Sequence, residues 1–139
     1  MYGQESCPRC AAPDTPIATP AGERPIAELR VGDLVYSVDR AAIRVVPVVR
    51  VGSTPVSGHH VMRLVLADGV VLEIRPGHPT ADGRLLSELK AGAKLDEQHV
   101  IVSAEIIPYR HERTYDILPQ SSSGAYFAGG ALIGSTLAH

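Results

Sequence analysis

The sequence predicts an all-β fold, and three observations favour this class. Apolar residues occur in short runs rich in valine and isoleucine, which pack well in sheets. The 13 glycines and 11 prolines are scattered between these runs, as turn residues are. No segment keeps helical spacing of apolar residues over several turns. With 139 residues and 45% apolar composition, the chain can enclose one core, so we expect a single small domain.

Several segments are predicted as strands. In chain order they are residues 34–38, 43–51, 61–66, 70–74, 99–107, 114–118 and 125–133. Pro47 lies inside the second segment and indicates an edge or a bulge there, because proline donates no ladder hydrogen bond. Asp68-Gly69 separates the third and fourth segments, and this dipeptide favours the positive φ of a tight hairpin turn.

Two short segments, residues 25–29 and 85–89, are the best helical candidates, each about one turn long. They belong to a longer similarity, because residues 26–32 align with residues 86–92 at a constant offset. A chance match of short amphipathic turns is the alternative. We favour an internal duplication, which predicts two related β-lobes with a site where they meet.

Composition and charge exclude several classes of function. Thirteen basic and 15 acidic residues give a formal charge of −2, which argues against a nucleic-acid partner. No stretch reaches the ~20 apolar residues that span a bilayer, and the first residues lack signal-peptide features. We expect a monomer without membrane association. The sequence specifies no localisation; an extracellular or cell-surface one is expected if the chain is part of a larger secreted protein.

The two cysteines, Cys7 and Cys10, form one Cys-Pro-Arg-Cys motif. Structural zinc commonly needs a second such pair or spaced histidines, and the chain has neither, so we expect no metal and no cofactor. The remaining alternatives are a redox pair or one working thiol beside a second one. A thioredoxin-like enzyme is disfavoured because that motif belongs to an α/β fold.

An ordered block begins at the second cysteine. It comprises Cys10-Ala11-Ala12-Pro13-Asp14-Thr15-Pro16-Ile17-Ala18-Thr19, then Gly22, Pro25-Ile26, Leu29 and Gly32-Asp33-Leu34-Val35-Tyr36-Ser37. This block resembles the opening of Hint domains, the pseudo-two-fold β fold with long curved hairpins shared by inteins and hedgehog autoprocessing domains. The resemblance implies that the Cys10 thiol attacks the Arg9 carbonyl and converts the Arg9–Cys10 peptide bond into a thioester. It divides the chain into an upstream segment, residues 1–9, and a Hint domain, residues 10–139.

A second block, Asp68-Gly69-Val70-Val71-Leu72-Glu73-Ile74-Arg75-Pro76-Gly77-His78-Pro79, resembles the family's Thr-x-x-His strand. The resemblance implies that His78 protonates the leaving amide nitrogen, which departs poorly without a proton. A turn histidine beside a proline is the alternative. Arg75 stands where the family usually has threonine. It is always charged and has no hydroxyl, so it either neutralises a developing oxyanion or points elsewhere.

A third block comprises Arg113-Thr114-Tyr115-Asp116-Ile117 and Gly124-Ala125-Tyr126-Phe127-Ala128-Gly129-Gly130-Ala131-Leu132-Ile133. It resembles the terminal strands of inteins, in which an aspartate matching Asp116 often assists the chemistry. A solvated residue at a strand end is the alternative for Asp116.

Inteins end in His-Asn, and the asparagine cyclises to cut the downstream bond. Here Gly134-Ser135 occupies those positions, and neither side chain carries an amide. The nearest resemblance is to short bacterial intein-like domains that lack this ending. It implies single-turnover, hedgehog-like cleavage of the chain's own upstream segment without splicing, with water, a thiol or another small nucleophile as acyl acceptor.

Two further hypotheses remain from the sequence. The departures at Arg75 and Gly134-Ser135 suggest, as an alternative function, a catalytically degenerate Hint fold that acts as a binding or structural module. Cys7 is the candidate redox partner of Cys10, because a disulfide between them would remove the nucleophile until it is reduced. The alternatives are that Cys7 attacks the thioester formed at Cys10 or merely accompanies it.

Overall fold

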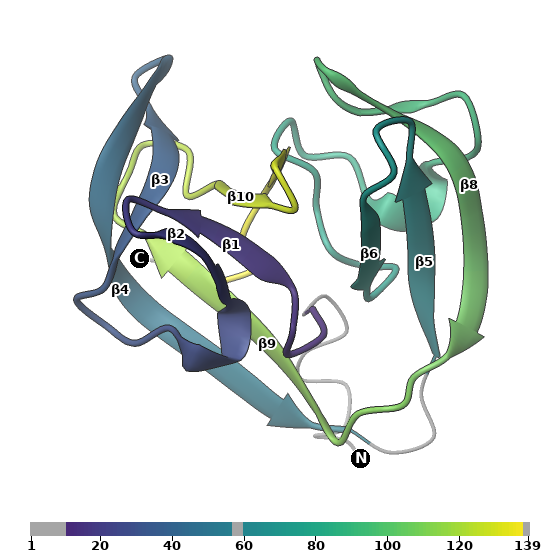
Figure 1. Ribbon diagram of the computed structural model, residues 1–139, viewed down its shortest axis with the longest axis horizontal. Coiled ribbons are helices and arrows are strands. Elements are labelled where there is room, and N and C mark those ends of the chain that lie inside the picture. The colour runs from purple at the N-terminus through teal and green to yellow at the C-terminus, as the bar shows by residue number, and fades with distance from the viewer. Residues whose placement is uncertain (1–10, 57–59, 138–139) are drawn as a thin grey trace.

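The computed structural model describes residues 11–56 and 60–137, and within these ranges the chain is built of strands (Figure 1). The strands are β1 (Pro16–Thr19), β2 (Gly22–Pro25), β3 (Leu34–Asp39), β4 (Ala42–Pro55), β5 (His60–Leu66), β6 (Val71–Ile74), β7 (Lys94–Asp96), β8 (His99–Pro108), β9 (Arg113–Pro119), β10 (Tyr126–Ala128) and β11 (Ala131–Ile133). Two 3₁₀ turns, η2 (Ile26–Glu28) and η3 (Leu86–Glu88), are the helical segments within the described ranges. Neither of these turns has the length or apolarity to span a bilayer. The all-β class is confirmed.

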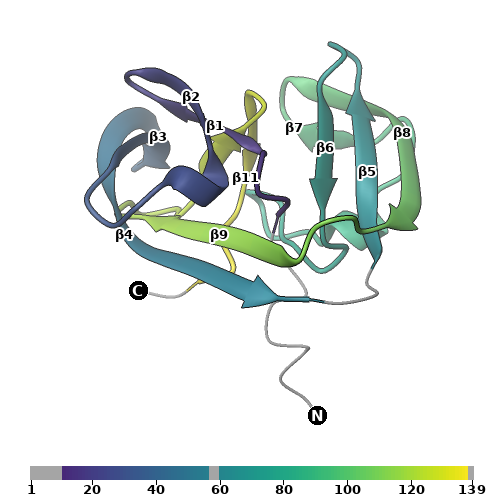
Figure 2. The same ribbon diagram turned by 60° about the horizontal axis from the view of Figure 1, so that its bottom comes forward.

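The strands form three antiparallel sheets that make two lobes. Sheets β11-β10-β1-β2 and β3-β4-β9 form one lobe, and sheet β6-β5-β8-β7 forms the other (Figure 1). The long strands β4 and β9 lie side by side along the edge of the first lobe (Figure 2). The chain crosses between lobes from β4 to β5 and returns from β8 to β9.

The predicted internal duplication is present in the fold. Each 3₁₀ turn leads into a turn with a glycine in the left-handed region, Gly32 at φ +97° and Gly92 at φ +93°. The N–H of Gly32 donates to the carbonyl of Val48 at 2.8 Å, and that of Gly92 donates to the carbonyl of Ile101 at 2.7 Å. The two lobes therefore repeat one supersecondary unit.

The repeat extends further than the sequence analysis predicted. The Thr15 N–H donates to the Ala12 carbonyl at 3.1 Å, and the His78 N–H donates to the Arg75 carbonyl at 3.0 Å. Thr15 and His78 each lie in a Pro-x-x-Pro sequence, which was an overlooked signal of the duplication. The two copies thus hold threonine in one lobe and histidine in the other at the equivalent position.

Residues 125–133 were predicted to favour strand and contain two strands, β10 and β11, rather than one continuous strand. The chain forms a hairpin of β10 and β11, because Gly129 at φ +59° and Gly130 at φ +88° make a tight turn between them. The sequence prediction also misses β1, β2 and β7, which are only three or four residues long. The hairpin predicted around Gly69 is confirmed, and this glycine has φ +92°.

The two halves of strand β4 pair with different strands, because the register changes in the middle of β4. Its first half pairs with β3, and Leu34 lies opposite Pro47. A register shift between Val48 and Arg50 follows directly, and the second half pairs with β9. The bulge predicted near Pro47 is therefore present, and it lets one long strand turn from β3 to β9.

The β10–β11 hairpin joins the two lobes at the centre. On one side the Gly129 N–H donates to the Pro16 carbonyl at 2.8 Å. On the other side the Gly134 N–H donates to the Pro79 carbonyl at 3.1 Å. Tyr126 is the largest fully buried side chain of the described residues and lies in this hairpin. The site predicted where the lobes meet is built around it.

Candidate functional site

Three predicted site residues, Cys7, Arg9 and Cys10, lie outside the described residues. His78, Arg75 and Asp116 are described, and each of them can be placed relative to Ala11, where the description of the chain begins.

Ala11 lies between the strands that carry the predicted site residues. It exchanges backbone hydrogen bonds with Tyr115, donating at 2.7 Å and accepting at 2.8 Å, and it forms a bridge with Ile74. Tyr115 directly precedes Asp116, and Ile74 directly precedes Arg75. The start of the described chain is thus fixed beside both candidate positions.

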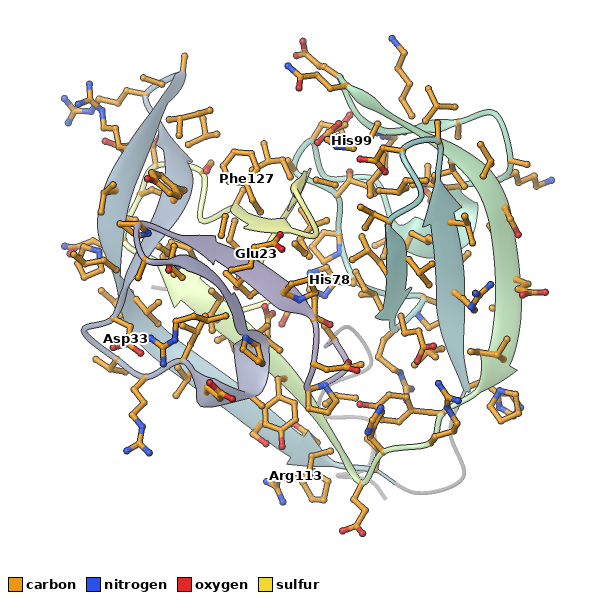
Figure 3. The ribbon with its side chains drawn as sticks, in the orientation of Figure 1. Glu23, Asp33, His78, His99, Arg113 and Phe127 are labelled. Carbon is orange, nitrogen blue, oxygen red and sulfur yellow. The ribbon has the colours of Figure 1, made fainter. Side chains whose placement is uncertain are left out.

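His78 is completely buried at the junction of the lobes (Figure 3). Its Nε2 lies 2.6 Å from the carbonyl oxygen of Gly134, and its ring meets the ring of Tyr126 edge-on, with centroids 6.5 Å apart. Because a carbonyl only accepts hydrogen bonds, neutral His78 carries its proton on Nε2. Nδ1 is then the nitrogen that takes up a second proton.

Asp116 is a buried carboxylate with four donors. Its exposed fraction is 1%, which excludes the solvated alternative. Oδ1 accepts from the Tyr126 hydroxyl at 2.6 Å and from the Ile117 N–H at 2.9 Å. Oδ2 accepts from the N–H and the hydroxyl of Thr136 at 2.7 and 2.5 Å. These bonds compensate for burial of the charge, and burial together with Asp116 raises the pKa of Tyr126, which stays a donor.

The segment from Gly134 to Leu137 connects His78 with Asp116. A Cβ at Gly134 would lie 2.8 Å from the backbone oxygen of Thr80, so the backbone packs closely there. The next residue, Ser135, donates its hydroxyl to the Ile117 carbonyl at 2.6 Å. The intein-like His-Asn pair is absent, but the backbone that replaces it still contacts the site.

Arg75 lies half-buried at the end of β6, with two unsatisfied donors. Its Nε and Nη1 are inaccessible to solvent and have no hydrogen-bond partner among the described residues. Burial lowers the pKa of Arg75, and the nearby Tyr109 partly opposes this effect. The guanidinium can therefore bind an acceptor that forms near it, although no described residue supplies one.

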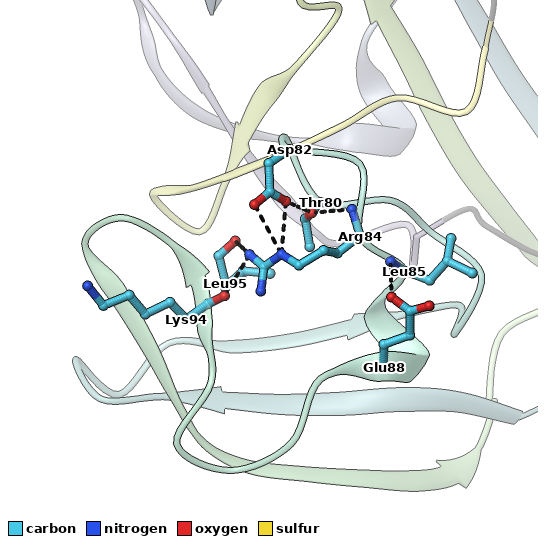
Figure 4. Close-up of polar contacts among 7 residues, drawn as sticks. All are labelled: Thr80, Asp82, Arg84, Leu85, Glu88, Lys94 and Leu95. Atoms are coloured by element: carbon cyan, nitrogen blue, oxygen red, sulfur yellow. Dashed lines mark hydrogen bonds and ion pairs between the residues drawn. The ribbon is translucent and has the colours of Figure 1, made fainter.

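A network of polar contacts centred on Arg84 stabilises the loop after His78 (Figure 4). The Thr80 hydroxyl donates to Asp82, and Nε of Arg84 donates to both oxygens of that carboxylate at 3.0 and 3.1 Å. The same guanidinium donates from Nη2 to the carbonyls of Lys94 and Leu95. These contacts connect the loop to β7 and so stabilise the backbone of Pro79 and Thr80, against which Gly134 packs.

A separate cleft of about 1040 Å³ opens between the lobes. Ile43 and Phe127 contribute to its apolar lining, and Lys94 and His99 contribute to its polar lining. Figure 3 shows Phe127 and His99 on this side of the molecule, away from Arg113. His78 does not line the cleft, so the cleft is not the site described above. In residues 11–56 and 60–137, no group of three or more acidic, histidine or cysteine side chains is suited to hold a metal ion.

Sequence reasoning missed Tyr126 and Thr136 as partners of Asp116. The position of Tyr126 between small apolar residues indicates a core side chain, but it does not show where its hydroxyl points. Thr136 carried no signal, because its role depends on a fold that returns the C-terminal segment to β9.

The structure is a duplicated all-β domain, in which a central hairpin joins two related lobes and a buried histidine lies at their junction. A family model for the Hint domain matches residues 9–105, and the chain belongs to this family. No curated protein sequence matches the chain.

Solved structures of inteins share the fold. A bacterial intein-like domain from Clostridium thermocellum has a TM-score of 0.76 at 16% identity, covering 91% of this chain and 97% of that one. A DnaB intein from Synechocystis has a TM-score of 0.74 at 17% identity, covering 93% and 99%. The gp41-1 intein has a TM-score of 0.69 at 24% identity, covering 91% and 98%. The expected Hint-type, intein-like fold is confirmed.

Proposed function

We propose that the domain cleaves its own Arg9–Cys10 bond and does not splice. The Cys10 thiol gives up its proton as its sulfur attacks the Arg9 carbonyl carbon, a C–S bond forms, and the C–N bond breaks as the Cys10 nitrogen takes up one proton to become an amine. The products are a thioester on the upstream segment and a free amino group. The amide nitrogen leaves poorly unless it is protonated, so the step requires a group placed to give it a proton.

The observation that carries the proposal is the arrangement of His78. Its Nε2–H donates to the Gly134 carbonyl at 2.6 Å, so Nδ1 is the nitrogen that takes up the thiol proton and passes it to the leaving nitrogen. Ala11, the residue after Cys10, pairs with Ile74 only four residues before His78. Both facts support His78 as the acid for the Arg9–Cys10 bond.

Arg75 is the second proposed catalytic residue. The attacked carbonyl oxygen becomes negative in the tetrahedral intermediate and needs donors that are already in place. The buried Nε and Nη1 of Arg75 have no partner among the described residues, which supports this role over one in a structural ion pair. A guanidinium in place of the family's threonine would then substitute a charged donor for a hydroxyl.

The proposed reaction stops after cleavage at the upstream side. Gly134 and Ser135 carry no side-chain amide, so no cyclisation can cut the downstream bond. The thioester therefore passes to water, a thiol or another small nucleophile.

A thiol-trapping experiment tests the proposal. The chain carrying an upstream tag is incubated with a reductant and a small alkanethiol, and the fragments are weighed. We expect the upstream segment to appear as its thioester with the added thiol, and the Cys10→Ala variant to stay intact. An intact wild-type chain that behaves like this variant would favour the binding or structural module.

Cys7 adds a proposed redox control. A Cys7–Cys10 disulfide would keep the attacking sulfur unavailable, and a thiol reductant would release it. Full-length protein that stays uncut after reduction, with Cys10 shown to be a free thiol, would contradict this control.

A further inference from the structure

A single buried carboxylate contacts both groups that hold His78. Asp116 Oδ1 accepts from the hydroxyl of Tyr126, whose ring packs edge-on against His78. Asp116 Oδ2 accepts from Thr136, two residues after the Gly134 carbonyl that lies against Nε2 of His78. Asp116 is therefore connected to the imidazole of His78 in two ways, through Tyr126 on one side and through Thr136 and Gly134 on the other.

The Gly134 carbonyl has to be held in place by its neighbours, because the segment has little regular structure after β11 ends at Ile133. On its upstream side the Gly134 N–H donates to Pro79. On its downstream side Thr136 makes two hydrogen bonds to a charged, buried acceptor, which are the strong kind. Thr136 and Asp116, together with the Ser135 hydroxyl bond to the Ile117 carbonyl, thus fix the segment downstream of the Gly134 carbonyl that orients His78.

We infer that Asp116 and Thr136 are positioning residues for His78, and that upstream cleavage requires the C-terminal segment to be seated. This inference rests on the proposed function, because it concerns the acid of that reaction. When the segment is seated, the Gly134 carbonyl selects the Nε2–H tautomer and leaves Nδ1 for proton transfer. When Thr136 is released, only the Ser135 hydroxyl bond to Ile117 and the Gly134 N–H bond to Pro79 still restrain this carbonyl, so its hydrogen bond to Nε2 of His78 selects the tautomer less strongly.

The consequence is a coupling between the two ends of the domain. Cleavage of the Arg9–Cys10 bond depends on residues 134–137, although Gly134 and Ser135 carry no side-chain amide that could cut the downstream bond. The Hint ending would be retained in this chain as a support for His78.

The test compares the tautomer of His78 in full-length chains that cannot cleave. Imidazole ¹⁵N spectra are recorded for the Cys10→Ala protein and for the same protein with Thr136→Val, Asp116→Asn or Thr19→Val. Thr136→Val keeps the backbone N–H and removes only the hydroxyl. Thr19→Val is the matched control, because the Thr19 hydroxyl donates to the Gly22 carbonyl in the β1–β2 turn, away from the site.

We expect His78 to be the Nε2–H tautomer in the Cys10→Ala and Thr19→Val proteins and a mixture of tautomers in the Thr136→Val and Asp116→Asn proteins. In chains that keep Cys10, Thr136→Val should slow upstream cleavage about tenfold or more, the loss expected from a misplaced catalytic group. Thr19→Val should cleave at the wild-type rate.

An unchanged Nε2–H tautomer in folded Thr136→Val protein would overturn the inference. If Asp116→Asn fails to fold, the milder Thr136→Val spectrum decides alone. If the wild-type chain does not cleave at all, the proposed function fails, and the ¹⁵N spectra still decide whether Asp116 and Thr136 position His78.

Discussion

At the scale of single residues, the buried imidazole of His78 is held by hydrogen bonding and by packing. A backbone carbonyl fixes one nitrogen, and the edge contact with Tyr126 limits ring rotation. In the proposed reaction, an imidazole held in this way would lose little entropy on reaching the transition state, which is the advantage of a preorganised acid.

Replacing His78 by glutamine should therefore abolish most of the upstream cleavage. Glutamine can keep a hydrogen bond to the Gly134 carbonyl but cannot deliver a proton at neutral pH. We expect a rate loss of about 10²–10⁴-fold, the usual contribution of a general acid. Single-turnover rates from intact mass measure it, with thermal unfolding as the folding control. A His78→Gln chain that cleaves at the wild-type rate would remove His78 from the mechanism.

Arg75 should show opposite effects on stability and cleavage. Its two buried donors have no partner among the described residues and are a cost in the folded state, so Arg75→Met should raise the free energy of unfolding by about 1–3 kcal/mol. If these donors stabilise the oxyanion, the same change should slow cleavage by about 10²-fold. Urea titration and cleavage rates measure the two effects. A less stable variant that cleaves normally would contradict both expectations.

The sequence predicted these residues unequally well. His78, Arg75 and Asp116 follow from ordered family-like blocks. The structure places His78 and Asp116 at the junction of the lobes and Arg75 directly after Ile74, the bridge partner of Ala11. The partners of Asp116 could not be predicted, because Tyr126 and Thr136 reach it only after the β10–β11 hairpin and the C-terminal segment have folded back onto β9.

At the scale of elements, the end of β11 requires a glycine for close packing. A Cβ on Gly134 would lie 2.8 Å from a backbone oxygen, whereas the nearest atom to a Cβ on Gly52 would be the side-chain tip of Leu137 at 3.2 Å, with the nearest backbone oxygen at 3.9 Å. Gly134→Ala should therefore cost about 1–3 kcal/mol of stability, as overpacking does, and Gly52→Ala should cost less. Equal unfolding midpoints in urea for the two variants would show that the backbone at Gly134 has room to shift.

Asp96 links β7 of one lobe to the central hairpin. Burial alone would raise its pKa, but hydrogen bonds from the Leu132 N–H, His99 and the Gln98 N–H hold the pKa of Asp96 below its usual value. A carboxylate with a lowered folded pKa stabilises the fold above its unfolded pKa of about 3.9, and that contribution is lost as the pH falls through the folded pKa.

The Asp96→Asn variant tests this link by its pH dependence. The wild-type protein should be the more stable of the two at neutral pH, and the difference should shrink as the pH is lowered from about 5 to about 2. Thermal unfolding of both proteins across this range measures it. A difference that stays constant with pH would show that Asp96 does not titrate with the fold.

The elements were predictable where the local chemistry is strong. The Asp68-Gly69 hairpin, the β4 bulge near Pro47 and both 3₁₀ turns agree with local sequence signals. The short strands β1, β2 and β7 were not predictable, because three or four residues carry too little alternation and their pairing is set by partners distant in sequence.

At the scale of the whole molecule, the fold consists of two copies of one supersecondary unit, which the β10–β11 hairpin connects. Pro16 and Pro79, equivalent residues of the two copies, accept hydrogen bonds from opposite ends of that hairpin. His78 lies beside one of these contacts, and its equivalent Thr15 lies beside the other. The duplication therefore accounts for a scaffold with two similar positions, of which one carries the side chain able to transfer a proton.

The central claim is that this scaffold cuts the chain before Cys10. The most direct measurement is the intact mass of the full chain, extended by an upstream tag and kept under reducing conditions, before and after addition of hydroxylamine. We predict a fragment beginning at Cys10 together with a tag fragment ending in an Arg9 hydroxamate, both absent from the Cys10→Ala variant. A wild-type chain that stays intact, with Cys10 reduced and the domain folded, would contradict the account.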